Sequence, residues 1–315
     1  MILGYRDMTT TRPARVPQPT TRRTVTAPGN SRQRPDSPGD DGVVPFSLPA
    51  DLADACFDRL DADPPVDVEG ASHLLYRMAA TVPTGSTAKL EAMAADRVPP
   101  GADPAPVAET WLERPGLAWS CWAVSTLYAA LVGHAGALTA GVLGARRIDP
   151  ASVPVDFHSM VEVRSEDGGG GGGEARRWLT DPYFWMAPVE APVGDSLRRG
   201  AWGEAVADGP VWRTLVGSCV GRYLLRYRTF TTALTASDVE GLCRVSVTFT
   251  GVASRARAHL ATADGIVAAS ADRDGVVRLR RWRAGPTEVW GVPCETVELD
   301  GWPDAEHILG ALGRH

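Results

Sequence analysis

The chain of 315 residues lacks the features that mark several large protein classes. Its five cysteines include no C-x-x-C pair, so we expect neither a zinc site nor a disulfide framework, and a reducing, cytoplasmic compartment. No run of about 18 apolar residues is present, so no membrane-spanning helix is expected. The N-terminus lacks the apolar core of a signal peptide. Lysine is almost missing: Lys89 stands alone among 32 basic residues, a bias typical of GC-rich bacteria.

Positive charge is also in deficit. The net charge of −6 and the pI of about 5.6 argue against nucleic acid as a partner, and no membrane partner is expected. The composition, 44% hydrophobic and 22% charged, is that of a globular protein with room for two or three small domains. Residues 1–44 are rich in Arg, Thr, Pro, Ser and Gly and are expected to form a disordered tail. The sequence does not indicate an oligomeric state.

Apolar spacing divides the rest of the chain into helices followed by strands. Helical periodicity predicts helices at residues 48–60, 68–80, 104–112 and 122–132. After Gly133, alternation predicts strands at 138–145, 155–163, 176–180, 224–233, 243–250, 258–262, 266–269, 276–282 and 287–292. Six glycines at 168–173 predict a hairpin tip, and a last helix is expected at 304–312. This order predicts an α+β fold.

Three residues in these elements form a candidate catalytic set. Cys121 stands at the expected start of the 122–132 helix, His158 lies in an alternating strand, and Asp181 ends the next strand. The unpaired N–H dipoles of a helix start favour a thiolate, and an imidazole within reach stabilises it as an ion pair. A carboxylate on the far ring nitrogen fixes the tautomer. The set therefore predicts a cysteine nucleophile and acyl transfer through a thioester, with no bound metal.

Each residue also has an ordinary structural interpretation. A cysteine in an apolar helix is commonly a small core residue, which is the expected role of the other four cysteines: Cys56, Cys219, Cys243 and Cys294. A strand histidine is commonly satisfied locally, and an aspartate before proline commonly belongs to a turn. The catalytic interpretation depends on finding all three in this order. His259 has no carboxylate-bearing strand near it in the sequence and was given no role.

Around these residues the chain resembles the arylamine N-acetyltransferase family. The histidine strand FHSMVEV (157–163) and the aspartate strand WLTDPYF (178–184) are similar to those of the family, as is LLYRM (74–78) with Val82 and Pro83. The resemblance covers roughly residues 45–315. It implies that Cys121, His158 and Asp181 are the catalytic residues.

The resemblance also implies a domain plan. It consists of an N-terminal helical bundle at 45–133 carrying the cysteine, a central antiparallel β-barrel at 134–236 carrying the histidine and aspartate, and a C-terminal sheet-plus-helix lid at 237–315. The helical bundle and barrel form a core like that of the cysteine proteases.

The chain departs from the family on both sides of the cysteine and after the aspartate. Residues 117–119, Leu-Ala-Trp, replace Arg-Gly-Gly, and an alanine follows Trp122 where the family has glutamate. Residues 182–185, Pro-Tyr-Phe-Trp, replace a glycine-containing turn near the acyl-donor entrance. Aromatic residues are therefore expected to line the substrate or donor cleft: Trp119, Trp122, Phe157, Tyr183, Phe184 and Trp185.

The predicted function is ping-pong acyl transfer from a thioester to a small amine, with acyl-CoA or an acyl carrier protein as the co-substrate and no permanently bound cofactor. Three alternatives stay open. The first is an amide synthase of secondary metabolism that acts on a carrier-bound acyl chain. The second is a transglutaminase-like or papain-like cysteine hydrolase, and the third is a binding protein that has lost catalysis.

Overall fold

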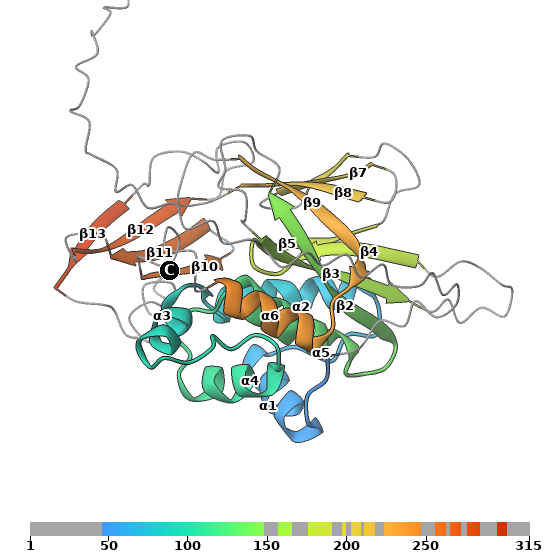
Figure 1. Cartoon of the computed structure of the whole chain (residues 1–315), viewed down its shortest axis with the longest axis horizontal. Coiled ribbons are helices and arrows are strands. Elements are labelled where there is room, and N and C mark those ends of the chain that lie inside the picture. Colours follow the sequence, from blue (N-terminus) through green and yellow to red (C-terminus); the bar gives the residue numbers. More distant parts are fainter. Residues whose placement is uncertain are drawn as a thin grey trace, which may run out of the picture. The chain divides into compact units, whose positions relative to one another are not determined.

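The computed structural model describes residues 46–147, 157–165, 176–190, 197–199, 203–208, 211–217, 224–246, 256–262, 265–271, 276–283 and 295–300. All of them belong to one compact unit, Asp41–His315. The described helices are α1 (Ala50–Leu60), α2 (Val68–Thr81), α3 (Thr87–Ala94), α4 (Pro104–Glu113), α5 (Cys121–Gly133) and α6 (Ala236–Ser246) (Figure 1). The four helices predicted before residue 133 are confirmed as α1, α2, α4 and α5. None of the described helices is long and apolar enough to cross a bilayer.

Two helices begin at acidic caps that the sequence encodes. Asp67 accepts a hydrogen bond from the N–H of Gly70 at 2.8 Å ahead of α2. Asp103 accepts from the N–H of Ala105 at 3.0 Å, with Pro104 in the first turn of α4. Each such cap contributes about 1 kcal/mol. The spacing of apolar residues then turns one face of α2 inward: Ala71, Leu74, Leu75, Met78 and Ala79.

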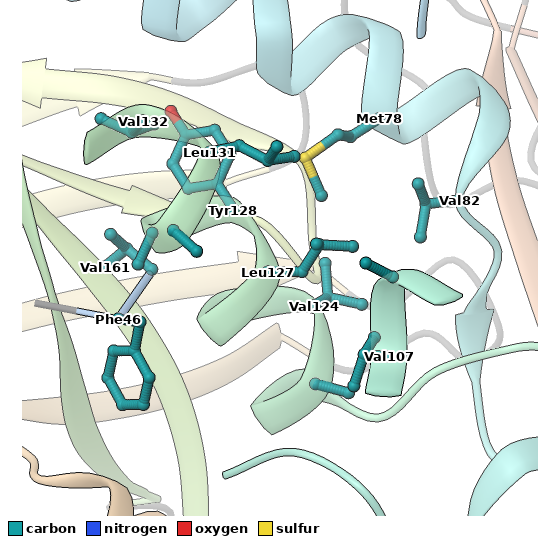
Figure 2. Close-up of a cluster of buried hydrophobic side chains, with 14 of the residues drawn as sticks. Phe46, Met78, Val82, Val107, Val124, Leu127, Tyr128, Leu131, Val132 and Val161 are labelled. Carbon is teal, nitrogen blue, oxygen red and sulfur yellow. The ribbon is translucent and has the colours of Figure 1, made fainter. Parts of the chain in front are cut away.

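Helix α5 is the centre of the largest hydrophobic cluster. Its residues from Trp122 to Val132 are all buried, as expected for a helix that is apolar on every side. They pack with side chains from α1, α2, α4, β2 and β3. Figure 2 shows part of this cluster, in which Leu127 and Leu131 of α5 gather with Met78 of α2 and Val161 of β3. This packing fixes the direction in which the N-terminus of α5 points.

Eight described strands form an antiparallel sheet in the order β5-β4-β3-β2-β9-β8-β7-β6. Their bounds are β2 (Leu138–Arg147), β3 (Phe157–Ser165), β4 (Arg176–Asp181), β5 (Met186–Glu190), β6 (Leu197–Arg199), β7 (Gly203–Asp208), β8 (Val211–Gly217) and β9 (Leu224–Ala233). Helix α5 packs against β2 and β3. The predicted closed barrel is not seen in this part of the chain, because the edge strands β5 and β6 do not pair with each other. Closure requires pairing between strands distant in sequence, which alternation does not specify.

A second sheet joins an N-terminal residue pair to the C-terminal strands. Its order is β1-β10-β11-β12-β13, formed by β1 (Thr84–Gly85), β10 (Arg257–Thr262), β11 (Gly265–Ala271), β12 (Val277–Arg283) and β13 (Glu295–Leu299). Thr84 lies opposite His259, and Gly85 lies opposite Ala258. At Gly85 the two backbones approach so closely that a Cβ would collide with the carbonyl of Arg257. This short strand therefore brings residues about 175 positions apart into register.

Helix α6 corrects one predicted strand. The strand expected at 243–250 is wrong in its described part, because residues 243–246 end α6. The N–H and hydroxyl of Thr235 donate to Asp238 at 2.9 and 2.7 Å, and the N–H of Asp238 donates back at 3.2 Å. This reciprocal cap starts a helix and overrides the β-propensity further along. Lys89 of α3, a helix that was not predicted, donates to the carbonyl of Ser246 at 2.6 Å.

Several predictions lie outside the described residues. They are the disordered tail at 1–44, the glycine hairpin tip at 168–173, the strand at 287–292 and the closing helix at 304–312. The other predicted strands are confirmed where the structure describes them.

Candidate active site

Cys121 is the first residue of α5. Ser120 precedes it in an extended conformation and makes no side-chain cap, and the N–H of Val124 donates the first helical hydrogen bond, to Ser120 at 3.1 Å. The N–H groups of Cys121, Trp122 and Ala123 therefore precede the helical hydrogen-bond ladder. Cys121 is also the most accessible of the described cysteines, being half-buried where Cys56 and Cys243 are buried. A partly exposed thiol at a helix start is suited to nucleophilic attack.

Burial separates the chemistry of the other two described thiols from that of a nucleophile. Desolvation raises the pKa of Cys56 to about 12. Desolvation also dominates at Cys243, where the charges of Cys121 and Glu240 act in the same direction and the pKa rises to about 12. Both thiols are therefore protonated at neutral pH, which agrees with their expected role as core residues.

His158 and Asp181 form a buried pair. Nε2 of His158 lies 2.7 Å from Oδ2 of Asp181, and the two side chains are 4% and 0% exposed. Since the carboxylate oxygen accepts, Nε2 carries the hydrogen. The Cys121 side chain is close enough to the His158 ring to favour its charged form. With Nε2 engaged by Asp181, Nδ1 is the ring nitrogen left for the thiol. The three residues predicted from the sequence are thus brought together in one chain of contacts.

The turn after β4 fixes Asp181 through its second oxygen. Oδ1 accepts hydrogen bonds from the N–H groups of Tyr183 and Phe184, both at 3.1 Å. The hydroxyl of Thr180 closes the same turn by donating to the carbonyl of Met186 at 2.6 Å. Asp181 therefore takes part in the turn and also pairs with His158. One carboxylate oxygen builds the turn, and the other binds the imidazole.

A buried pair of hydroxyl groups joins the helix of Cys121 to the strand of His158. Oγ of Ser125, one turn into α5, lies 2.9 Å from Oγ of Ser159, the residue after His158. Both serines are fully buried, and they satisfy each other. The sequence carries a signal for this pair, because Ser159 follows His158 directly and Ser125 lies one helical turn after Cys121. This bond holds the two elements in a constant relative position.

Burial and charge act in opposite directions on the pKa of His158. Burial lowers it, because desolvation penalises the imidazolium. The charge and hydrogen bond of Asp181, together with the contact with Cys121, favour the imidazolium and outweigh burial, which raises the pKa from 6.5 to about 10. The ring is therefore charged at neutral pH and able to stabilise a thiolate beside it.

Two of the predicted cleft residues lie against the imidazole. The ring centroid of His158 is 5.8 Å from that of Tyr183 and 5.1 Å from that of Phe184. The two aromatic rings meet edge to face at 4.9 Å, and both are partly exposed. They form an apolar cover over the His158–Asp181 pair. Such a cover excludes water and strengthens the electrostatic interaction within the pair.

The other predicted cleft residues lie deeper. Trp185 is 4% exposed and packs with Ala79, Ile266 and Ala268. Its backbone has a φ of 57°, a left-handed conformation that costs a residue with a Cβ about 1–2 kcal/mol. Trp119 and Trp122 are 1% and 3% exposed and belong to the cluster around α5. For Phe157 the structure gives the backbone, at the start of β3.

The described residues offer no site suited to a metal ion. Nowhere in these residues do three or more His, Cys, Asp or Glu side chains gather in an arrangement that could hold a metal ion. The available chemistry is that of a nucleophile, a charged imidazole and an orienting carboxylate, with helix N–H groups to receive an oxyanion.

Comparison with known proteins places the fold. No family model matches the chain, and no curated protein matches it in sequence. Solved structures do match. Arylamine N-acetyltransferase from Salmonella typhimurium is 18% identical, with a TM-score of 0.58 over 84% of this chain and 89% of that chain. The Mycobacterium marinum enzyme, solved in complex with CoA, is 15% identical, with a TM-score of 0.58 over 83% and 91%.

In a third similar structure the acidic residue of the triad is glutamate, where this chain has Asp181. The arylamine N-acetyltransferase from Bacillus cereus is 15% identical, with a TM-score of 0.57 over 79% of this chain and 91% of that chain, and has a Cys-His-Glu catalytic triad. At these identities the likeness shows the fold. The chain therefore has the fold of the arylamine N-acetyltransferases over about four-fifths of its length, with little sequence in common.

Proposed function

We propose that this protein transfers an acyl group from a thioester to an amine through a thioester on Cys121. The observation that carries the proposal is the position of the His158 imidazole, which is hydrogen-bonded to Asp181 and favoured in its charged form by the neighbouring Cys121. In the first step the thiolate attacks the thioester carbonyl. The leaving thiol takes its proton from the imidazolium, and Cys121 keeps the acyl group.

In the second step the amine attacks the acyl-enzyme. His158 takes a proton from the attacking nitrogen, the Cys121 thiolate leaves, and an amide is released. Asp181 keeps the imidazole oriented throughout. The free N–H groups in the first turn of α5 would receive the oxyanion of both tetrahedral intermediates, an interaction worth roughly 3 kcal/mol per donor. The proposed division of labour follows the predicted domains: 45–133 supplies the cysteine, 134–236 the imidazole and carboxylate, and 237–315 the lid.

The donor we propose is acyl-CoA, and the acceptor an arylamine or hydrazine. The fold of the arylamine N-acetyltransferases and the CoA complex of the Mycobacterium marinum enzyme support this choice. The test is incubation with acetyl-CoA in the absence of amine, followed by intact mass measurement. We expect an acetyl adduct on Cys121 that aniline removes as acetanilide. A Cys121→Ala variant should form no adduct, whereas Cys56→Ala, which changes a buried thiol of α1, should behave like the wild type.

An amide synthase acting on a carrier-bound chain is the second candidate. The aromatic cover favours it, because the rings of Tyr183 and Phe184 over His158 replace a smaller turn and call for a different acyl group. Turnover of a carrier-bound acyl chain without turnover of acetyl-CoA would select this candidate. Release of free acid without any amine would instead indicate a hydrolase. A Cys121 thiol no more reactive toward iodoacetamide than Cys56 would indicate a binding protein.

A further inference from the structure

Three side chains form a row beside the candidate active site. The N–H of Gly85 donates to the carbonyl of Trp119 at 2.8 Å, and the N–H of Trp119 donates to Pro83 at 2.9 Å, so Trp119 bridges to Thr84 on one side of β1. On the other side of β1, Thr84 pairs with His259 of β10. Residues paired across strands project their side chains to the same face. Trp119, Thr84 and His259 therefore share a face.

The row contains two buried nitrogen atoms without hydrogen-bond partners. Trp119 is 1% exposed and His259 is 6% exposed. In the part of the chain that the structure describes, Nε1 of Trp119 and Nε2 of His259 have no hydrogen-bond partner. A buried polar atom left unsatisfied costs about 1–3 kcal/mol, so two of them on one face call for an explanation.

The two atoms are complementary in kind. Nδ1 of His259 lies 3.1 Å from the carbonyl oxygen of Thr84, and a carbonyl only accepts, so Nδ1 carries the hydrogen and Nε2 is a bare acceptor. Burial, and then the nearby charge of Arg257, lower the pKa of His259 to about 4, which outweighs the opposite effect of the Thr84 hydrogen bond. The ring is thus neutral at pH 7. Trp119 Nε1–H is a donor only.

The row adjoins both segments that carry the candidate triad. Trp119 stands two residues before Cys121. Ala268 lies opposite His259 in β11 and packs against Trp185, four residues after Asp181. A ligand chain that leaves Cys121 along this face would pass a donor and then an acceptor. Both would be inside the protein, where water competes poorly for them.

We propose that Trp119 Nε1–H and His259 Nε2 bind a secondary amide of the substrate. The amide carbonyl would accept from Trp119, and the amide N–H would donate to His259. The inference rests on the proposed function, since it assigns a binding role within the same site. Two sources offer such an amide: the pantetheine arm of a thioester donor and an amide-bearing amine acceptor.

Matched substitutions isolate each atom. Trp119→Phe removes the donor and keeps an aromatic ring. His259→Asn keeps an N–H for the carbonyl of Thr84 and removes the acceptor. The control is Trp111→Phe, because the buried indole of Trp111 donates to the carbonyl of Thr81 at 3.3 Å. Losing that satisfied bond should lower the melting temperature. Trp119→Phe truncates a buried indole in the same way, and His259→Asn shortens a buried ring, but neither breaks a hydrogen bond, so both should lower the melting temperature less than Trp111→Phe does.

The experiment measures Cys121 acylation by intact mass with S-acetylpantetheine, which has two amides, and with S-phenyl thioacetate, which has none. We expect Trp119→Phe and His259→Asn to acylate about 5- to 30-fold more slowly with S-acetylpantetheine, and at the wild-type rate with S-phenyl thioacetate. A second outcome is that the variants acylate Cys121 with S-acetylpantetheine at the wild-type rate, but transfer the acyl group more slowly to 4-aminoacetanilide than to aniline. That result would assign the amide to the acceptor. The proposal would be overturned if Trp119→Phe and His259→Asn keep the wild-type selectivity between substrates with and without an amide and lose as much stability as Trp111→Phe. The two atoms would then serve a buried water molecule or packing.

A binding measurement separates this inference from the proposed function. Calorimetry with pantetheine on Cys121→Ala, alone and combined with His259→Asn or Trp119→Phe, requires no chemistry. Weaker pantetheine binding in the combined variants, with no acylation of the wild type by any ester, would keep the amide site and reject acyl transfer. The amide site alone would be rejected by a different result. In it, Cys121 is acylated, the combined variants bind pantetheine as tightly as Cys121→Ala does, and the single variants keep the donor and acceptor selectivity of the wild type.

Discussion

The N–H of Phe184 donates to Oδ1 of Asp181 at 3.1 Å, and the ring of the same Phe184 lies 5.1 Å from the imidazole that Oδ2 of Asp181 binds. One carboxylate thus orients the imidazole and also places the aromatic cover above it. The electrostatic and the steric parts of the site therefore depend on a single buried side chain.

Asp181→Asn separates these two roles. The amide oxygen of asparagine can still accept from the turn N–H groups, but the charge that favours the imidazolium is lost. We expect transfer to fall by about 10²–10⁴-fold, by analogy with the loss of the acid in other triads, with a small change in melting temperature. Steady-state rates and thermal unfolding of the same preparation check this. A rate close to that of the wild type would mean that the carboxylate acts only through the turn.

The raised pKa of His158 predicts a loss of stability at high pH. Between the ordinary value of 6.5 and about 10 the folded protein keeps a proton that the unfolded chain has released. The stabilisation is therefore complete below pH 6.5 and disappears as the pH rises through about 10. Urea unfolding should show the advantage of wild type over His158→Gln shrinking across this range. The exposed His73, changed to Gln, serves as the control and should follow the wild type, and parallel curves for wild type and His158→Gln would contradict the linkage.

At Trp185 the cost of a left-handed backbone opposes the stabilisation from a buried indole. Trp185→Gly relieves about 1–2 kcal/mol of left-handed strain, but removing a buried indole costs about 3–5 kcal/mol. The cost of the cavity should exceed the relief of strain, so the free energy of unfolding should fall by about 2–3 kcal/mol. Trp185→Phe keeps the strain and part of the ring, so it should fall between Trp185→Gly and wild type. A glycine variant at least as stable as wild type would show that strain dominates.

Gly85 and Gly241 make a contrasting pair. At Gly85 an added methyl group would collide with the backbone carbonyl of Arg257, which cannot move without separating β1 from β10. At Gly241, inside α6, nothing lies within 4 Å. We expect Gly85→Ala to destabilise by about 3 kcal/mol and Gly241→Ala to stabilise by about 0.5–1 kcal/mol. Chemical unfolding of both variants measures this, and similar effects at the two positions would refute the close approach of β1 and β10.

The sequence predicted the parts of the site that local patterns encode. Apolar spacing located α5, and alternation located the strand of His158, because both periods follow from backbone geometry. Thr235 followed three residues later by Asp238 is a cap signal that the sequence carries, whereas the β-branched run after Cys243 favours a strand. The structure shows that the cap decides the conformation as far as Ser246.

What the sequence could not show depends on pairing between distant segments. The sequence around His259 offers no carboxylate partner and so predicts no role for it, whereas its actual partner is the backbone carbonyl of Thr84. No side-chain pattern reveals such a bond across 175 positions. The open order of the large sheet is of the same kind, since strand alternation is identical in an open sheet and in a barrel.

The hydrogen bond between Lys89 and Ser246 has a consequence for self-modification. A protein that holds a reactive acyl thioester is at risk of acylating its own amines. In this chain Lys89 is the only lysine, and its ammonium group is engaged with a helix-end carbonyl at 2.6 Å. Under the proposed function, the protein would offer the acyl group on Cys121 a single side-chain amine, and acylation of that lysine would remove the charge that binds the end of α6.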